Sequence, residues 1–229
     1  MNESPPIAPA KLLALDTGSP VVSVALTLDG KTAAERSVEQ ARSSVALLEL
    51  IDECLREAGL SPRDLNGIAV LRGPGSFTGL RVGLATVLGL RAALAIPVAV
   101  LPSLEVLAAH AIERAATGTI VGVVDALRGE WFASAFRAAP GTLGEPTAEA
   151  KILPVASLAS FAPATVCGFG VRGLADRGVL PGGLEVLEAS PLAATAARLA
   201  CNRQEWWDAA LLTQPLYLRE PAVTLPNPR

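Results

Sequence analysis

The residues best suited to chemistry form a short acidic motif near the start of the chain, Asp16-Thr17-Gly18-Ser19. Asp16 ends an apolar segment typical of a buried strand, and a glycine turn with two hydroxyl residues follows it. In such a turn, backbone N–H groups and hydroxyls can surround a phosphate while the carboxylate holds a metal ion or a water. The same residue types also favour an ordinary β-turn. The motif therefore leaves two interpretations open, a phosphate-binding loop and a turn without a ligand.

A second apolar segment that ends in aspartate occurs near the middle of the chain. The loop after it reads Asp125-Ala126-Leu127-Arg128-Gly129. Its bulky side chains stand where a phosphate would need close approach of the backbone. A clamp built from two such loops would therefore lack its second half, and the pattern is poor evidence for ATP hydrolysis.

A glycine-rich turn, Arg72-Gly73-Pro74-Gly75, precedes a long helical segment that begins near Ser76. Glycines before a helix N-terminus can hold an anion, and Ser76 can cap the helix. The turn differs from a P-loop because no lysine follows the glycines and the spacing is different. It is also consistent with a sharp turn from strand to helix that binds nothing.

The helix predicted at residues 76–94 carries small residues at helical spacing. Interior glycines destabilise a helix by roughly 1 kcal/mol each relative to alanine, so close packing should compensate for them. Either its own sheet or a second helix or subunit can supply that packing, and we favour a partner surface. The candidate partner residues on this helix are Gly79, Val82, Gly83, Thr86, Gly89 and Ala93.

The preceding helix, predicted at residues 43–58, is amphipathic. We expect Ala46 and Leu50 to lie off its buried face and to extend the partner surface. The residues expected on the buried face are Leu47, Leu48, Ile51, Cys54, Leu55 and Ala58.

The histidine and cysteine content limits the possible chemistry. His110 is the single histidine, so a multi-histidine metal site is excluded, and a Ser-His or Cys-His pair would require His110 itself. Its apolar helical surroundings predict a structural role. The three cysteines, Cys54, Cys167 and Cys201, are far apart and odd in number, which suggests a reducing compartment. The composition thus disfavours a hydrolase or a metalloenzyme, and we expect no metal and no other cofactor.

Length and charge favour a folded chain of one large or two small domains. The 229 residues are 51% hydrophobic and 18% charged, and 19 basic against 22 acidic side chains give a net charge of −3, which disfavours a free-standing nucleic-acid binder. Residues 82–101 are almost entirely apolar, but Arg91 and Pro97 argue against a membrane span. The first ten residues do not have the pattern of a secretory signal. We expect a cytoplasmic protein that does not contact the membrane.

Strand and helix patterns repeat between the two halves of the chain. The first half has the order β-β-β-α-β-α-β, and the second half starts again with a strand that ends in Asp125 and an antiparallel partner at 130–137. This repetition predicts a duplicated α/β fold with two lobes. The expected divisions are a disordered lead-in at 1–10, an N-terminal lobe at 11–102, a C-terminal lobe at 103–219 and a loose tail at 220–229.

Three segments resemble the bacterial TsaB (YeaZ) family: LALDTGSPVVSVAL at 13–26, RGPGSFTGLRVGLATVLGL at 72–90 and DALRGEWF at 125–132. The similarity extends from about residue 11 to 219. The resemblance implies an actin-like fold (ASKHA, ribonuclease H-like) in which mixed sheets are flanked by helices. It also implies a role in making threonylcarbamoyladenosine (t6A) in tRNA, as a non-catalytic paralogue of the transferase subunit TsaD.

The resemblance further implies particular partners. The chain would form a heterodimer with a TsaD-like subunit through the helices at 43–58 and 76–94, and a TsaE-like ATPase would join the complex. Family members can also self-associate through the same surface, so a homodimer is the alternative when the chain is alone. The chain would meet tRNA only through the complex. The paired histidines that hold the metal of TsaD are absent, so transferase chemistry does not carry over. Ser43-Ser44 and Leu127 depart from the family pattern. The alternative function is an actin-like phosphotransferase or ATPase that uses Asp16.

Overall fold

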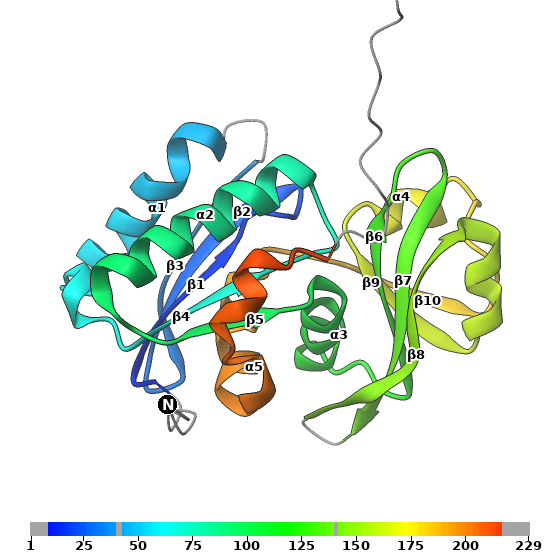
Figure 1. Cartoon of the computed structure of the whole chain (residues 1–229). Coiled ribbons are helices and arrows are strands. Elements are labelled where there is room, and N and C mark those ends of the chain that lie inside the picture. The colour runs from blue at the N-terminus through cyan, green and yellow to red at the C-terminus, as the bar shows by residue number, and fades with distance from the viewer. Residues whose placement is uncertain (1–8, 40–42, 140–141, 217–229) are drawn as a thin grey trace, which may run out of the picture.

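The computed structural model describes residues 9–39, 43–139 and 142–216 (Figure 1). Most of the lead-in expected at 1–10 and all of the tail expected at 220–229 lie outside these residues. So do the side chains of Ser43, Ser44 and Ala46, although the backbone of these three residues belongs to a helix. Within the described residues the chain forms two lobes that lie next to one another.

The first lobe is built on a mixed five-stranded sheet. Its strands follow the order β3-β2-β1-β4-β5, and β1 pairs antiparallel with β2 and parallel with β4. The strands are β1 (Lys11–Asp16), β2 (Val21–Leu28), β3 (Lys31–Glu39), β4 (Gly67–Leu71) and β5 (Val98–Leu101).

The second lobe repeats this topology. Its order is β8-β7-β6-β9-β10, and β6 again pairs antiparallel with the following strand and parallel with the strand on its other side. The predicted duplicated fold with two lobes is therefore confirmed. The strands are β6 (Thr119–Asp125), β7 (Glu130–Ala139), β8 (Thr142–Pro154), β9 (Ala164–Gly168) and β10 (Leu184–Glu188).

Helices cover both faces of the first sheet. Helix α1 packs against β2 and β3, and α2 packs against β4 on the same face, whereas α5 packs against β1 and β2 from the opposite face (Figure 1). Each helix buries an apolar side against the sheet. The helices are α1 (Ser43–Glu57), α2 (Phe77–Leu94), α3 (Ser103–Glu113), α4 (Val171–Asp176) and α5 (Ala193–Asn202), with short 3₁₀ segments η2 (Pro62–Asp64), η3 (Val155–Phe161), η4 (Gln204–Trp206) and η5 (Ala209–Thr213).

The helix that follows the last strand of each lobe packs on the sheet of the other lobe. Helix α3 leaves β5 and packs against β6 of the second sheet, and α5 leaves β10 and packs against the first sheet. The two helices contact one another between the lobes. The 103–219 segment expected as a C-terminal lobe thus includes a helix that completes the core of the first lobe.

Alternation along β1 shows how the first sheet is buried. Leu12 and Ala14 belong to the core cluster that includes α5, whereas Leu13 and Leu15 belong to the cluster that includes α1 and α2. Successive side chains of a strand point to opposite faces, so a strand that is covered on both sides reads as a continuous apolar run. Asp16 closes that run at the carboxyl end of β1, and its side chain is fully buried.

The buried face of α1 differs from the prediction at two positions. Leu48, expected in the core, is 66% exposed, and Leu50, expected off the buried face, is buried at 9%. The residues that face the sheet follow the spacing i, i+3, i+4, i+7, i+8, which Leu50 satisfies and Leu48 does not. They are Leu47, Leu50, Ile51, Cys54 and Leu55.

Helix α2 is the one described helix whose length and hydropathy match those of a membrane span. Its Leu80, Leu84 and Val87 are buried on the first sheet, and its Arg81 and Arg91 are exposed. In this fold α2 therefore serves as a covering helix of the first lobe.

Candidate functional site

The carboxylate of Asp16 holds its own turn. Its Oδ1 atom accepts hydrogen bonds from the backbone N–H groups of Gly18 at 3.0 Å and of Ser19 at 3.2 Å. Its Oδ2 atom is buried and has no hydrogen-bond partner. Burial raises the pKa of Asp16 to about 6, against the lowering effect of Ser19 and the two backbone amides. An ionised Asp16 is therefore unfavourable in this position unless a further partner approaches it.

The first turn of α2 covers the loop where a phosphate would be held. The backbone N–H of Ser76 donates to the Gly18 carbonyl at 2.8 Å. A Cβ atom built on Gly75 would lie 2.6 Å from the Gly18 carbonyl oxygen, and one on Gly18 would lie 2.7 Å from Cδ2 of Leu80. Because backbone and leucine atoms already occupy these approaches, the loop of residues 16–19 faces α2 at short range and is not open to a ligand on that side.

The glycine-rich turn before α2 is covered in the same way. The Gly73 carbonyl accepts from the backbone N–H of Ser103 at 2.8 Å, and the Arg72 carbonyl accepts from the N–H of Leu216 at 2.8 Å. A Cβ atom on Gly73 would meet the Leu216 carbonyl oxygen at 3.0 Å. The Oγ atom of Ser76 accepts from the N–H of Gly79 at 3.2 Å, so Ser76 caps α2 as predicted. The turn thus joins β4, α2, α3 and the end of the described chain.

Gly83 contacts the Asp16 loop directly. A Cβ atom at Gly83 would lie 2.2 Å from Oγ1 of Thr17, which is itself only 2% exposed. No real side chain tolerates that distance, so glycine at this position is explained by a contact inside the chain. Gly79, one turn earlier, and Leu50 of α1 are also buried. The structure therefore corrects the expected surface position of Leu50, Gly79 and Gly83, which are internal packing residues.

The other candidate partner residues on α2 are accessible. Gly89 and Ala93 are exposed, and nothing lies within 4 Å of a Cβ atom built on Gly89. Val82 and Thr86 are half-buried, and Oγ1 of Thr86 donates to the Val82 carbonyl at 2.9 Å.

Helices α1 and α2 carry apolar side chains on their solvent side. Leu48 is 66% exposed on α1 and Leu88 is 40% exposed on α2, where exposed alanines and a glycine flank it at helical spacing. We call the exposed apolar residues of these two helices the outer apolar surface. It consists of Leu48, Ala85, Leu88, Gly89, Ala92 and Ala93.

The Asp125 loop of the second lobe is a hairpin turn. Oδ1 of Asp125 accepts from the N–H of Leu127 at 2.7 Å, as Asp16 does from its own loop. Leu127, Arg128 and Gly129 all have positive φ angles, of 64°, 58° and 79°. The N–H of Glu130 donates to the Leu127 carbonyl at 3.2 Å, which closes a tight turn between β6 and β7. Leu127 is 69% exposed, so its side chain points from this loop into solvent.

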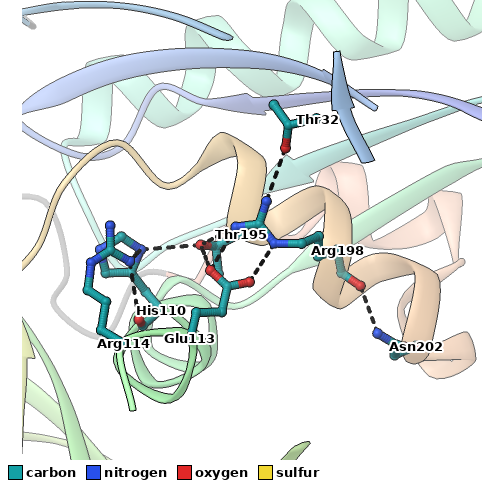
Figure 2. A network of polar contacts seen from close by, with 7 residues as sticks. All are labelled: Thr32, His110, Glu113, Arg114, Thr195, Arg198 and Asn202. Atoms are coloured by element: carbon teal, nitrogen blue, oxygen red, sulfur yellow. Dashed lines mark hydrogen bonds and ion pairs between the residues drawn. The ribbon is translucent and has the colours of Figure 1, made fainter. Parts of the chain in front are cut away.

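The structure places a serine beside the single histidine, which the sequence did not reveal. The Nε2 atom of His110 lies 3.1 Å from Oγ of Ser190 and 3.3 Å from the Ser190 backbone N–H (Figure 2 shows the histidine with its other neighbours). Its Nδ1 atom lies 3.0 Å from Nη1 of Arg114. Nδ1 also lies 3.2 Å from Oγ1 of Thr195. The hydroxyls of Thr195 and Ser190 can accept the single proton of the neutral ring, whereas the doubly protonated ring would face a donor-only neighbour at both nitrogens, the Arg114 guanidinium and the Ser190 amide.

This environment makes His110 a weak base. Burial, and to a smaller extent the positive charge of Arg114, lower the pKa of His110 to about 4. The side chain is 1% exposed, between α3 and the segment that leads into α5. A general base for a serine nucleophile needs a pKa near the operating pH and access to substrate. The pair therefore fits the structural role predicted for His110.

A network of ion pairs and hydrogen bonds continues from His110 across the two lobes (Figure 2). Arg198 of α5 holds Glu113 of α3 through two contacts, Nε to Oε1 at 2.6 Å and Nη2 to Oε2 at 2.7 Å. Oγ1 of Thr195 donates to Oε2 of Glu113 at 2.6 Å, and Nη1 of Arg198 donates to Oγ1 of Thr32 on β3 at 3.1 Å. Burial would raise the pKa of Glu113, but the bonds from Arg198 and Thr195 outweigh it and lower that pKa.

Metal-binding and thiol chemistry have little support among the described residues. No group of three or more histidine, cysteine, aspartate or glutamate side chains there lies close enough to hold a metal ion. The three cysteines are unpaired, and burial raises the pKa of Cys54 to about 11 and that of Cys167 to about 12. Such thiols are poor nucleophiles at neutral pH.

The repeated sheet order, with an aspartate at the end of the first strand of each lobe, defines a duplicated α/β protein of the actin-like class. A family model described as TsaD, tRNA N6-adenosine threonylcarbamoyltransferase, matches residues 36–164, which is more than half of the chain. The chain belongs to the TsaB/YeaZ family within that larger group, as the sequence motifs predicted.

Individual relatives support this assignment. The chain is 36% identical over 123 residues to the tRNA threonylcarbamoyladenosine biosynthesis protein TsaB of Haemophilus influenzae, and the match covers 54% of this chain and about half (52%) of that relative. The solved YeaZ from Pseudomonas aeruginosa is 27% identical, with a TM-score of 0.75 over 91% of this chain and 100% of that chain. A second solved chain, described as an uncharacterized protein with similarity to peptidase YeaZ from Pseudomonas aeruginosa, is 29% identical with a TM-score of 0.76, over 92% of this chain and 100% of its own.

Proposed function

We propose that this chain is a non-catalytic subunit of the machinery that makes t6A in tRNA, and that it dimerises with and activates a TsaD-like transferase subunit. The name of the Haemophilus relative supports the pathway. The observation that carries the docking role is the outer apolar surface, with Leu48 and Leu88 exposed on neighbouring elements of one lobe.

The outer apolar surface suits a partner that presents helices. Burying the exposed leucines against a partner would stabilise the complex by roughly 25 cal/mol per Å² of apolar area removed from water. The small residues at Ala85, Gly89 and Ala92 leave room for another helix to approach closely. A partner with the same duplicated fold would present an equivalent pair of helices, and the two pairs would pack as a four-helix bundle. The same complementarity would allow a homodimer when the partner is absent.

Two features of the described residues support the non-catalytic part of the proposal. Oδ1 of Asp16 is held by the amides of its own loop, and the first turn of α2 covers one side of that loop. The nearest arrangement to a hydrolytic pair, Ser190 with His110, has a histidine whose pKa is lowered to about 4. We infer that a TsaE-like ATPase acts on the complex and that the protein works in the cytoplasm. A net charge of −3 disfavours tRNA binding by this chain alone, so we infer that tRNA is bound by the complex.

Co-expression with the TsaD-like protein of the same organism tests the docking role. We expect a heterodimer by size-exclusion chromatography with light scattering, and restored t6A synthesis when the remaining components are added. Leu48→Glu and Leu88→Glu should each raise the Kd of the heterodimer by tenfold or more, because an unpaired carboxylate would be buried at the interface. A tenfold change in Kd corresponds to about 1.4 kcal/mol of binding free energy. Val179→Glu is the matched control, since Val179 is 45% exposed but follows α4 in the other lobe. Wild-type association of both leucine variants would contradict the proposal.

A phosphotransferase or ATPase that uses Asp16 is the second candidate. The observation in its favour is the buried Oδ2 atom of Asp16, which has no hydrogen-bond partner and would gain from a cation. This function requires that the isolated chain bind Mg-ATP and turn it over. We rank it below the docking role because the contacts from Gly75 and Leu80 occupy one side of the loop.

A further inference from the structure

We propose that the Asp16 loop, residues 16–19, is the positioning element of the docking helix α2. In this role it sets the place of the outer apolar surface through contacts with the opposite side of that helix. The inference rests on the proposed function, because it concerns the same docking surface. It gives the loop a positioning role, because the first turns of α2 pack against it at short range.

The loop first fixes the start of α2. The Gly18 carbonyl accepts the N–H of Ser76, the residue that caps the helix, at 2.8 Å. Gly75 packs on the Gly18 backbone so closely that a Cβ atom would lie 2.6 Å from the Gly18 carbonyl oxygen. These contacts join two backbones without intervening side chains, so the helix start follows any movement of the loop.

The loop also contacts the second turn of α2. Gly18 lies against Leu80, and Thr17 lies against Gly83. Ser76, Leu80 and Gly83 have the spacing i, i+4, i+7, which places them on one side of the helix. Leu88 and Ala85 point to solvent instead. The loop therefore holds one side of α2 while another side carries the docking residues.

The carboxylate of Asp16 holds the loop in the shape that makes these contacts. Its Oδ1 atom accepts from the N–H groups of Gly18 and Ser19, the former being the residue whose carbonyl holds Ser76. Asp16 is consequently a positioning residue, two contacts away from the surface that the partner would touch.

The Thr17–Gly83 contact allows a direct test, because it leaves no room for even a methyl group at position 83. The new Cβ atom of Gly83→Ala would lie 2.2 Å from Oγ1 of Thr17, whereas ordinary contacts begin at 3.4 Å, so α2 must move by about 1 Å or the loop must give way. Interfaces depend on complementarity at that scale. We expect Gly83→Ala to weaken association with the TsaD-like partner by about tenfold, or about 1.4 kcal/mol. The double variant Thr17→Ala/Gly83→Ala should recover most of the affinity, since it leaves only the Thr17 Cβ atom, at 3.2 Å.

Gly89→Ala is the matched control for the change of residue type. Nothing lies within 4 Å of its new Cβ atom, so the isolated variant should keep its fold and gain helix propensity. Affinities are compared at a temperature where circular dichroism shows every variant to be folded, so that a loss of global stability alone leaves them unchanged. If Gly83→Ala does not fold, Asp16→Ala replaces it and should weaken association, while Asp16→Asn keeps the Oδ1 acceptor and should bind as the wild type does.

The outcomes separate this inference from the proposed function. A folded Gly83→Ala chain that binds as tightly as the wild type, or a double variant that recovers nothing, would overturn the positioning role while the docking role stands. If the wild-type chain forms no complex with the TsaD-like protein, the proposed function fails, and the positioning role fails with it.

Discussion

Glu113 on α3 and Arg198 on α5 form a two-point ion pair between the helices that join the lobes, with N–O distances of 2.6 and 2.7 Å. Each helix packs on the sheet of the lobe to which it does not belong in chain order. The pair therefore ties the two lobes together at their crossing point, and Thr32 extends the tie to β3. Actin-like folds contain two lobes, and here a bidentate contact fixes one lobe against the other.

We expect Arg198→Lys to destabilise the protein by about 1–2 kcal/mol, because lysine cannot reproduce the planar two-point contact. The expected loss is at the low end for charged hydrogen bonds, since the side chains of Arg198 and Glu113 are 38% and 29% exposed and water screens them. Urea denaturation followed by circular dichroism measures the change. Arg56→Lys is the control: its pair with Asp52 is 69% and 78% exposed, and the change should be below about 0.5 kcal/mol. Equal effects of the two variants would show that the two-point contact of Arg198 adds no more stability than an exposed ion pair does.

His110 should make the protein less stable in mild acid. Its pKa is lowered from 6.5 to about 4, so between these values the unfolded chain binds a proton that the folded chain does not. The stability contributed by neutral His110 is complete above pH 6.5 and falls as the pH drops towards 4, by about 3 kcal/mol in total. Urea midpoints of the wild type and of His110→Gln are measured from pH 7.5 to 4.5, and the His110 loss is the difference between the two profiles, because Asp16 titrates over the same range in both proteins. The wild type should lose stability relative to His110→Gln as the pH falls, and parallel profiles would contradict the assignment.

Titration of Asp16 should make the protein more stable as the pH falls, the opposite of the effect of His110. Burial raises its pKa from 3.8 to about 6, so the folded chain binds the proton more tightly than the unfolded chain does. The cost of the buried charge, about 3 kcal/mol, is present above pH 6 and is relieved as the pH falls towards 3.8. Asp16→Asn keeps the Oδ1 acceptor and removes the charge, so it should be more stable than the wild type at pH 7.5, with a difference that shrinks by pH 4.5. A constant difference across this range would show that Asp16 titrates as an ordinary carboxyl.

The sequence was sufficient for much of the fold. Continuous apolar runs such as Lys11–Asp16 and the repeated aspartate at the strand end predicted two lobes of one topology, because each depends on local pattern alone. In the second lobe the signals after residue 151 were weaker, and β10 and α4 were not predicted. Both elements are short, five residues in β10 and six in α4, and β10 is only partly buried, so neither shows a clear period.

The details of the site depended on tertiary contacts that pattern cannot supply. A small residue at Gly83 is expected both where a partner approaches and where the chain packs on itself, and only the contact with Thr17 distinguishes the two. Ser190 and His110 are 80 residues apart in sequence, and they meet because α3 and α5 cross between the lobes. Leu48 and Leu50 lie at opposite edges of the buried face of α1, and the apolar pattern alone does not say which edge the sheet covers.

ATP turnover by the isolated chain discriminates between the two candidate functions. We expect no Mg-ATP hydrolysis above a buffer control, because Gly75, Leu80 and the Ser76 amide already occupy the approach to the Gly18 backbone. A site that holds a cation on Asp16 would also stabilise the folded protein when Mg²⁺ and nucleotide are added, by the ordinary linkage of binding to folding. We therefore expect the same thermal midpoint with and without Mg-ATP, for the wild type and for Asp16→Asn alike. Hydrolysis by the wild type that Asp16→Asn abolishes, together with a Mg-ATP-dependent rise in the wild-type midpoint alone, would establish the phosphotransferase or ATPase function and remove the case for a purely docking subunit.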